Sequence, residues 1–306
     1  MRILSSAASL VLAAIVPATA LHTRVVASRI QQIHIDTGRV RVAGGWLYYE
    51  AAGRGPAVVL LHSGNLDSRT WDPQFLPLAR AHRVIRYDAR GLGRSSPADT
   101  SYAAHDDLLA LLDSLRVDRA SLVGLSGGAR IAIDFALAQP SRVDRLVLAE
   151  PGLSGWRYKD IGDTSWAKAW RAAAIRRDSI GMAVSWLASD WMKPAMEHAE
   201  LRPKLRQWIL AGAGNWLGLV RHGDLERVAN PPARGRTRLI RAPTLVIVGS
   251  RDLPEIHHIV DTLTATIPNV RRVTFAGAGH MVNLEQSDRF TEVVRAFLDP
   301  LNHPSP

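Results

Sequence analysis

The sequence predicts an α/β protein built on a mostly parallel sheet, and three observations point to it. Short apolar runs recur along the chain, and several lack the polar alternation of a half-exposed strand. Amphipathic segments with helical spacing separate these runs. Glycine-rich turns follow several runs directly, at the edge where ligands bind in open parallel sheets. This alternation indicates right-handed strand–helix–strand units.

The first half of the chain supplies most of the expected sheet. Two alternating segments, 39–43 and 46–50, flank Gly44-Gly45 and predict a β-hairpin with a two-residue glycine turn. The continuously apolar run Ala57–Leu61 predicts a strand buried on both faces. The same signals predict further elements: a helix over 72–81, a strand over 83–87, a helix over 102–115, a strand over 120–123, a helix over 129–138 and a strand over 142–149.

A helical insertion interrupts this rhythm. Residues 152–241 read as helices and loops without a clear strand, and they contain seven of the nine tryptophans. Alternation then resumes with a strand over 244–248, a helix over 255–267, a strand over 270–275 and a last helix over 287–298. We therefore expect the core in two parts, 38–151 and 242–306, with the insertion between them.

The first residues have the pattern of an export signal. Met1-Arg2 precedes an apolar run from Ile3 to Val16, and Ala18-Thr19-Ala20 follows. This predicts a signal peptide over 1–20, cleaved after Ala20, because the run is short for an uncleaved membrane anchor. Residues 21–37 would then form a linker or N-terminal arm. Without a later membrane-spanning stretch, we expect an exported protein, periplasmic or secreted, with no stable membrane insertion.

Composition excludes several classes of site and partner. The 306 residues include no cysteine, which rules out disulfides, lipid attachment at a cysteine and thiolate metal sites. The formal net charge is +10, and residues 151–241 hold sixteen Lys or Arg against eight Asp or Glu. Two interpretations of this excess stay open: steering of anionic substrates or surfaces, and an ordinary solvated basic surface. No basic run is interleaved with aromatics, so we expect no nucleic-acid partner.

The motif Gly124-Leu-Ser-Gly-Gly128 lies between an apolar strand and a helix. This is the context of a nucleophile elbow, a sharp turn that raises the Ser126 hydroxyl above the sheet. Gly124 and Gly128 would provide room for the turn, and the first helical N–H groups would face an oxyanion beside Ser126. Taken alone, the motif also fits a glycine-rich turn between a strand and a helix that has only a packing role.

Two further side chains follow strands later in the chain, namely Asp252 in Gly249-Ser-Arg-Asp252 and His280 in Gly277-Ala-Gly-His280. Separately, they fit a helix cap and a surface loop residue. Together with Ser126 they occupy one rim of the sheet in the order serine, acid, histidine. A serine hydroxyl needs a base during attack, so His280 is the candidate base and Asp252 would orient it.

The oxyanion of such a reaction needs preorganised N–H donors. Gly127 follows the candidate nucleophile and offers one. The loop His62-Ser63-Gly64, after a buried strand, offers the other, and we assign it to the N–H of Gly64. We expect His62 to organise this loop and not to act as a second base.

These motifs together resemble the α/β-hydrolase family, over nearly the whole chain after residue 40 outside the insertion. The resemblance rests on five segments: 62–64, 88–95, 124–128, 249–252 and 279–280. Residues 60–72 resemble the subgroup of enol-lactone hydrolases and non-metal perhydrolases. Two positions depart from the family pattern: Ser63 replaces the usual glycine of the oxyanion loop, and Gly127 stands where methionine or glutamine is common.

The resemblance implies a mostly parallel eight-stranded sheet flanked by helices, with a helical cap inserted after the sixth strand. It implies a triad of Ser126, Asp252 and His280, with oxyanion donors at Gly64 and Gly127. Some relatives take the acid from the preceding strand, which makes Glu150 the alternative acid. Of the seven tryptophans in the insertion, we expect two or three to face the site and the others to fill its core.

The implied function is hydrolysis of a small-molecule carboxylic ester or lactone through an acyl-enzyme, without a metal or organic cofactor. Two alternatives use the same triad: hydrolysis of a carbon–carbon bond, and acyl transfer, including transfer to peroxide. A third alternative is a small-molecule binding protein that retains the fold without turnover. The sequence carries no signal for the oligomeric state.

Overall fold

The computed structural model describes residues 33–159, 163–222 and 225–299. The predicted signal peptide and residues 21–32 of the predicted linker lie outside these ranges. The first strand already begins at Ile35, within the stretch that the sequence assigned to the linker. The end of that stretch is therefore part of the sheet, because residues 35–37 pair with residues 50–52 of the next strand.

The sheet has eight strands in the order β1-β2-β4-β3-β5-β6-β7-β8. β1 and β2, and β2 and β4, pair antiparallel, while the remaining neighbours are parallel. This confirms the predicted eight-stranded, mostly parallel sheet. The strands are β1 (Ile35–Val42), β2 (Gly45–Ala52), β3 (Ala57–Leu61), β4 (Arg83–Tyr87), β5 (Ala120–Leu125), β6 (Val143–Ala149), β7 (Thr244–Gly249) and β8 (Val270–Phe275).

The hairpin turn lies one residue earlier than predicted. Val42 pairs with Gly45, so the two turn residues are Ala43 and Gly44. Gly44 has a φ of 73°, which a glycine adopts without strain. Gly45 belongs to β2, where a Cβ would lie 2.3 Å from Ser96 Oγ. The second glycine thus allows close packing of a loop on the strand and does not form the turn.

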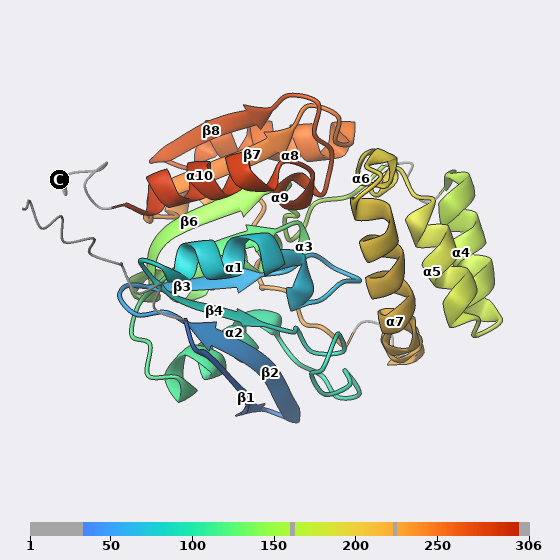
Figure 1. Cartoon of the computed structure of the whole chain (residues 1–306), viewed down its shortest axis with the longest axis horizontal. Helices are drawn as coiled ribbons and strands as arrows, with labels where there is room; N and C mark the ends of the chain where they lie inside the picture. Colours follow the sequence, from blue (N-terminus) through green and yellow to red (C-terminus); the bar gives the residue numbers. More distant parts are fainter. Residues whose placement is uncertain (1–32, 160–162, 223–224, 300–306) are drawn as a thin grey trace, which may run out of the picture. The chain divides into compact units, whose positions relative to one another are not determined.

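Helices cover both faces of the sheet. Figure 1 shows α1 (Asp72–Ala79) and α10 (Ser287–Leu298) in front of it, with α2 (Ala104–Ser114), α3 (Gly127–Ala138) and α8 (Pro254–Thr266) behind. All residues of β5 and β7 are buried, as their continuous apolar sequences predict. Short helical turns at η1 (Ser68–Trp71) and α9 (Val282–Glu285), which the sequence pattern did not reveal, flank the site described below.

The helical insertion, residues 152–241, connects β6 to β7. It contains α4 (Ser165–Ile175), α5 (Ser179–Leu187), α6 (Lys193–Glu197) and α7 (Leu201–His222), and no β-strand occurs among its described residues. These helices lie beyond the carboxyl ends of the strands (Figure 1). Within the described ranges, no helix combines the length and apolar character needed to cross a bilayer.

Candidate active site

Ser126 occupies the sharp turn between β5 and α3. Its φ of 55° is in the left-handed region, which a non-glycine residue adopts only where the surroundings enforce it. The two flanking glycines are required sterically: a Cβ on Gly124 would lie 2.6 Å from Ala129 N, and one on Gly128 would lie 2.1 Å from Leu61 O. The predicted use of glycine at both positions is therefore confirmed.

The structure brings Ser126, Asp252 and His280 together. Nε2 of His280 lies 2.9 Å from Ser126 Oγ, and Nδ1 lies 2.7 Å from Asp252 Oδ2. Asp252 and His280 are buried, whereas Ser126 is half-buried and reaches the pocket. With Nδ1–H donating to Asp252, Nε2 is free to accept the serine proton.

Asp252 is not the only acid here. The side chain of Glu150 is fully buried at the end of β6, and Oε1 accepts a hydrogen bond of 2.6 Å from Gly249 N–H. Burial alone would raise the pKa of Asp252, but the charge and hydrogen bond of His280 lower it below its ordinary value. Burial, and then the charge of Asp252, raise the pKa of Glu150 well above its ordinary value. Asp252, and not Glu150, is therefore the ionised partner of the imidazole.

Glu285 stabilises the loop that carries His280 by accepting hydrogen bonds from its backbone. Its Oε2 accepts from Gly279 N–H at 2.8 Å, and its Oε1 accepts from Met281 N–H at 3.0 Å, so one carboxylate holds the backbone on both sides of the histidine. Burial raises the pKa of Glu285. The sequence analysis missed this residue, although a lone glutamate in the apolar stretch after His280 was a usable signal.

Gly64 and Gly127 lie beside Ser126, as predicted for the oxyanion donors. Both line the same pocket, and a Cβ on Gly127 would lie 3.2 Å from Gly64 N. Gly64 N–H donates to no partner within the described ranges. Gly127 is the first residue of α3, where backbone N–H groups have no partner within the helix. The two groups are placed to receive a negatively charged oxygen.

Both ring nitrogens of His62 are already engaged. Nδ1 lies 2.7 Å from the Ser63 carbonyl oxygen, and Nε2 accepts from Ala89 N–H at 2.9 Å. The imidazole thus joins the loop after β3 to the loop after β4. This geometry agrees with the predicted role in organising the loop, in spite of the substitution at Ser63.

A pocket of about 410 Å³ opens above Ser126 and is lined mainly by apolar side chains. Three of the seven tryptophans of the helical insertion reach it, namely Trp166, Trp186 and Trp191, which confirms the expected number. Trp191 packs against His280 with ring centroids 4.4 Å apart. Trp166 and Trp186 meet edge to face at 5.7 Å. Gly152, Tyr158 and Met192 complete the contribution of the insertion to the pocket.

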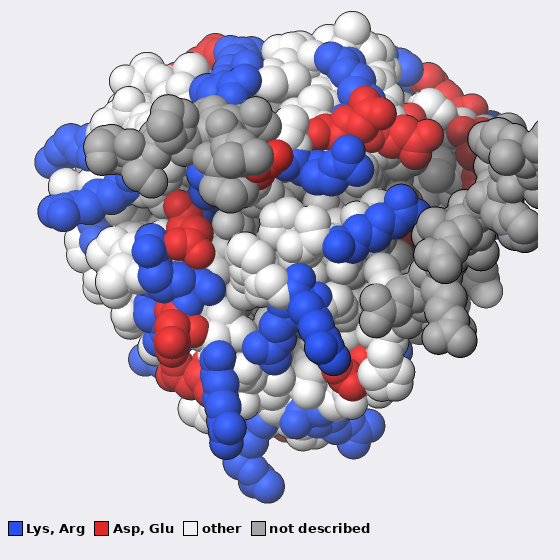
Figure 2. Space-filling view, turned by 60° about the vertical axis from the view of Figure 1, so that its left-hand side comes forward, with Lys and Arg blue, Asp and Glu red and all other residues white. Residues whose placement is uncertain are grey.

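Arg130 is the only Lys or Arg among the residues that line the pocket, and two acidic side chains neutralise its charge. Nη2 lies 2.6 Å from Glu226 Oε1, and Nη1 lies 3.7 Å from Asp134 Oδ2. The basic excess of the insertion therefore does not produce an unpaired cation in the pocket. On the side of the molecule that lies at the left in Figure 1, away from the helices of the insertion, Figure 2 shows Lys and Arg spread among fewer Asp and Glu. Sequence reasoning missed Arg130 and Glu226, which are far apart in the chain.

Glu150, Asp252 and His280 also form one group of potential metal ligands, with ligand atoms within 4.8 Å of one another. His280 already shares its nitrogens with Ser126 and Asp252. A cation would have to break this hydrogen-bonded chain to obtain its ligands. The donor set therefore fits proton transfer better than metal binding.

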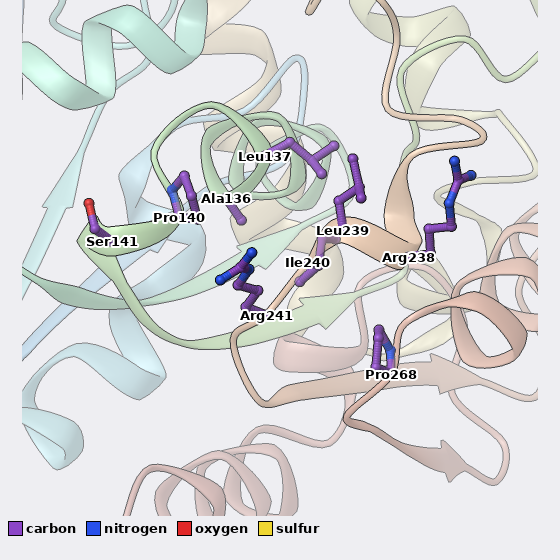
Figure 3. A pocket seen from close by; sticks show the side chains of 9 residues that line it. All are labelled: Ala136, Leu137, Pro140, Ser141, Arg238, Leu239, Ile240, Arg241 and Pro268. Atoms are coloured by element: carbon purple, nitrogen blue, oxygen red, sulfur yellow. The ribbon is translucent and has the colours of Figure 1, made fainter.

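A second and larger cavity, about 860 Å³, lies at the far end of α3. Figure 3 shows the side chains that line it, with Leu137 and Leu239 pointing toward one another and Arg238 and Arg241 among the remaining residues. Ser126, Asp252 and His280 do not line it. The smaller pocket is therefore the candidate active site.

Comparison with known proteins agrees with this geometry. A profile of the alpha/beta hydrolase family matches residues 58–293. The chain belongs to the alpha/beta hydrolase family. The match spans both parts of the core and the helical insertion, and it confirms the resemblance that the motifs indicated.

Solved alpha/beta hydrolases resemble this one over most of its length. The enol-lactonase from Burkholderia xenovorans LB400 is 26% identical, with a TM-score of 0.71 over 85% of this chain and 99% of that chain. A hydrolase from Pseudomonas aeruginosa PA01 is 32% identical, with a TM-score of 0.70 over 86% and 98%. A thermophilic esterase from Thermogutta terrifontis is 26% identical, with a TM-score of 0.72 over 86% and 98%. This alpha/beta hydrolase is therefore an enzyme with hydrolytic relatives.

Proposed function

We propose that the protein hydrolyses a carboxylic ester or lactone through an acyl-enzyme formed on Ser126. The observation that carries this proposal is the unbroken chain from Ser126 Oγ through His280 to Asp252, with steps of 2.9 and 2.7 Å. The similarity to an enol-lactonase and to an esterase supports the same class of bond.

In the proposed reaction, Ser126 Oγ attacks the carbonyl carbon while His280 Nε2 takes the hydroxyl proton. The N–H groups of Gly64 and Gly127 stabilise the oxyanion. His280 then returns the proton to the leaving alkoxide, which leaves the acyl group on Ser126. A water molecule, deprotonated by His280, releases the acid and regenerates the serine. Throughout, Asp252 stabilises the imidazolium without taking its proton.

The pocket favours a neutral, apolar acyl or alcohol group. Trp166, Trp186 and Trp191 offer flat apolar surfaces, while the counter-ions Glu226 and Asp134 neutralise Arg130. A carboxylate on the substrate would have to compete with Glu226 for Arg130. We therefore infer that the helices of the insertion act as a cap that selects uncharged substrates.

The test is hydrolysis of chromogenic acyl esters, from acetate to dodecanoate, by the wild type and by Ser126→Ala. We expect an optimum at a medium chain length and a loss of about four or more orders of magnitude in kcat for the variant. Undiminished activity in Ser126→Ala would overturn the acyl-enzyme. Turnover of β-diketones or of peroxide, without ester hydrolysis, would favour the carbon–carbon or perhydrolase alternative.

We also propose that the protein is exported after cleavage behind Ala20. The support is the charged start, the short apolar run and Ala18-Thr19-Ala20. Expression of the full chain, followed by N-terminal sequencing of the extracytoplasmic protein, tests this. A mature protein beginning at Leu21 is expected, and a product that keeps Met1 would contradict it.

A further inference from the structure

The fully buried Glu150 has one carboxyl oxygen that the protein leaves without a donor. Oε1 accepts from Gly249 N–H, but no N–H or O–H of the described residues reaches Oε2. A polar neighbour is the carboxylate of Asp252: the carboxyl oxygens that Glu150 and Asp252 offer lie within 4.8 Å of each other. Two carboxyl oxygens can share a hydrogen bond only when one of them carries a proton.

Electrostatics decide which carboxyl carries it. Two adjacent buried carboxylates cannot both be ionised at little cost. Asp252 faces His280 at 2.7 Å and also accepts from Leu253 N–H at 2.7 Å, so its charge is stabilised twice. Glu150 faces the charges of Asp252 and, with a weaker effect, Glu285 on α9, while among the described residues only Gly249 N–H donates to it. Burial and these charges raise the pKa of Glu150, which agrees with a neutral carboxylic acid.

The backbone supports a fixed role for this side chain. Glu150 has a φ of 44°, a left-handed conformation that is unusual for a residue with a long side chain. Its N–H continues the sheet by donating to the Ile247 carbonyl at 3.0 Å. The turn directs the carboxyl group between β6 and the loop after β7, where it meets both Gly249 and Asp252.

We propose that Glu150 is a positioning residue: a carboxylic acid, protonated at neutral pH, whose O–H donates to Asp252 and orients that carboxylate toward His280. This inference rests on the proposed function, because it assigns to Asp252 the role of the acid. Glu150 does not contact the substrate and transfers no proton. Its O–H stabilises the ionised form of Asp252, so that the aspartate does not take the proton from the imidazole during the reaction.

A matched pair of substitutions separates this role from simple packing. Glu150→Gln keeps the shape, an acceptor for Gly249 N–H and an N–H donor for Asp252, but it has no proton to lose. Glu150→Met keeps the approximate volume and removes both polar functions. We expect kcat of Glu150→Gln within about threefold of the wild type, and a decrease of about ten- to a hundredfold for Glu150→Met, the equivalent of one hydrogen bond to a charged group.

The pH dependence gives a second readout. In the wild type, the proton leaves Glu150 at alkaline pH, which places a second negative charge beside Asp252, His280 and Glu285. We expect an alkaline decrease in kcat for the wild type that is absent in Glu150→Gln. Equal damage in Glu150→Gln and Glu150→Met, or the same alkaline decrease in Glu150→Gln, would overturn the proposal.

Infrared spectroscopy tests the proton without any substrate. The difference spectrum between the wild type and Glu150→Gln at neutral pH should contain the carbonyl stretch of a protonated carboxylic acid. A difference spectrum that shows only an ionised carboxylate would overturn the proposal even if the enzyme is active. Conversely, if Ser126→Ala retains activity and the proposed function fails, this measurement still reports whether Glu150 is protonated.

Discussion

At the carboxyl ends of β5, β7 and β8, the side chains of Ser126, Asp252 and His280 each have a hydrogen-bond partner. In the helical insertion, the indole N–H groups of Trp166, Trp170 and Trp186 are buried without one among the described residues. Seven of the nine large apolar side chains exposed in the described part of the chain also lie within residues 151–241. Hydrogen bonds thus fix the three side chains at the rim of the sheet, while apolar contacts mainly hold the insertion together.

This difference assigns different tasks to the two regions. Proton transfer tolerates little displacement, so its groups are fixed by strained backbone and buried carboxylates. Apolar contacts have little directionality, so a layer of tryptophans can adjust to substrates of different shape. We therefore expect substitutions at the rim to lower kcat, and substitutions in the insertion to change which substrates are accepted.

The largest effect is expected for Asp252→Asn. The amide keeps the shape but cannot stabilise the imidazolium, so kcat for an ester should fall by about three to four orders of magnitude with little change in KM. The melting temperature of the variant serves as a control for folding. A decrease of less than about tenfold would mean that Glu150 takes over as the acid.

Trp191→Leu tests the tryptophan of the insertion that packs on the candidate base. Because Trp191 packs on His280, its loss should loosen the imidazole and admit water, and kcat/KM should fall by about ten- to a hundredfold. Trp170→Leu removes a tryptophan that does not line the pocket and provides the matched control. Equal losses of kcat/KM in both variants would show that the two tryptophans act only through the general packing of the insertion, and not through contact with His280.

Glu226→Gln, a substitution in the insertion, should change the preference between negatively charged and neutral esters by about tenfold. Without Glu226, only Asp134 remains near Arg130, so esters with a terminal carboxylate should improve relative to neutral esters of the same length. The ratio of the two kcat/KM values is the measurement. Glu197→Gln, which breaks an ion pair with Arg251 away from the pocket, should leave this ratio unchanged.

Glu150→Gln should have the smallest effect on activity, and its main effect should be on the pH dependence of stability. Since the pKa of Glu150 is raised in the folded state, unfolding releases a proton once the pH exceeds the unfolded value, and stability declines until the folded pKa is reached. Glutamine has no such proton. The gain in unfolding free energy of the variant should therefore grow as the pH rises above the unfolded pKa of a glutamate, by at most about 1.4 kcal/mol per pH unit, and level off only above the raised pKa of the folded state.

Denaturant titrations of both proteins across this range measure the gain. Glu292→Gln, at an exposed glutamate of α10, is the control and should show no pH-dependent difference from the wild type. A gain for Glu150→Gln that stays constant with pH would contradict a proton retained on Glu150.

Much of the fold and of the site could be predicted because the signals are local. The apolar runs of β3, β5 and β7 identify buried strands, and Gly124 and Gly128 reveal a turn that only small residues permit. The positions of Asp252 and His280 after strands place them at the same rim as Ser126. In such cases a few neighbouring residues carry the physical constraint.

The remaining features depend on contacts between distant segments. Nothing around Glu150 in the sequence shows that its carboxyl meets Gly249 and Asp252, and nothing around Arg130 identifies Glu226 as its counter-ion. The hairpin turn was misplaced by one residue for the same reason: the close neighbour of Gly45 is Ser96, on a separate loop. Partners of this kind are chosen by tertiary packing, which local patterns do not encode.

The arrangement of the sheet also determines when the enzyme becomes active during its synthesis. Ser126 belongs to the first half of the chain, but its hydrogen-bond partner His280 follows β8, which comes last along the chain among the described strands and forms an edge of the sheet. The segment after the histidine loop is in turn tied to η1 and α1: the Asn283 amide donates to Thr70 O at 2.7 Å, and Gln74 Nε2 donates to Asn283 O at 3.0 Å. Under the proposed mechanism, a nascent chain that contains Ser126 but not yet His280 lacks its base, so activity requires synthesis of the segment that carries His280.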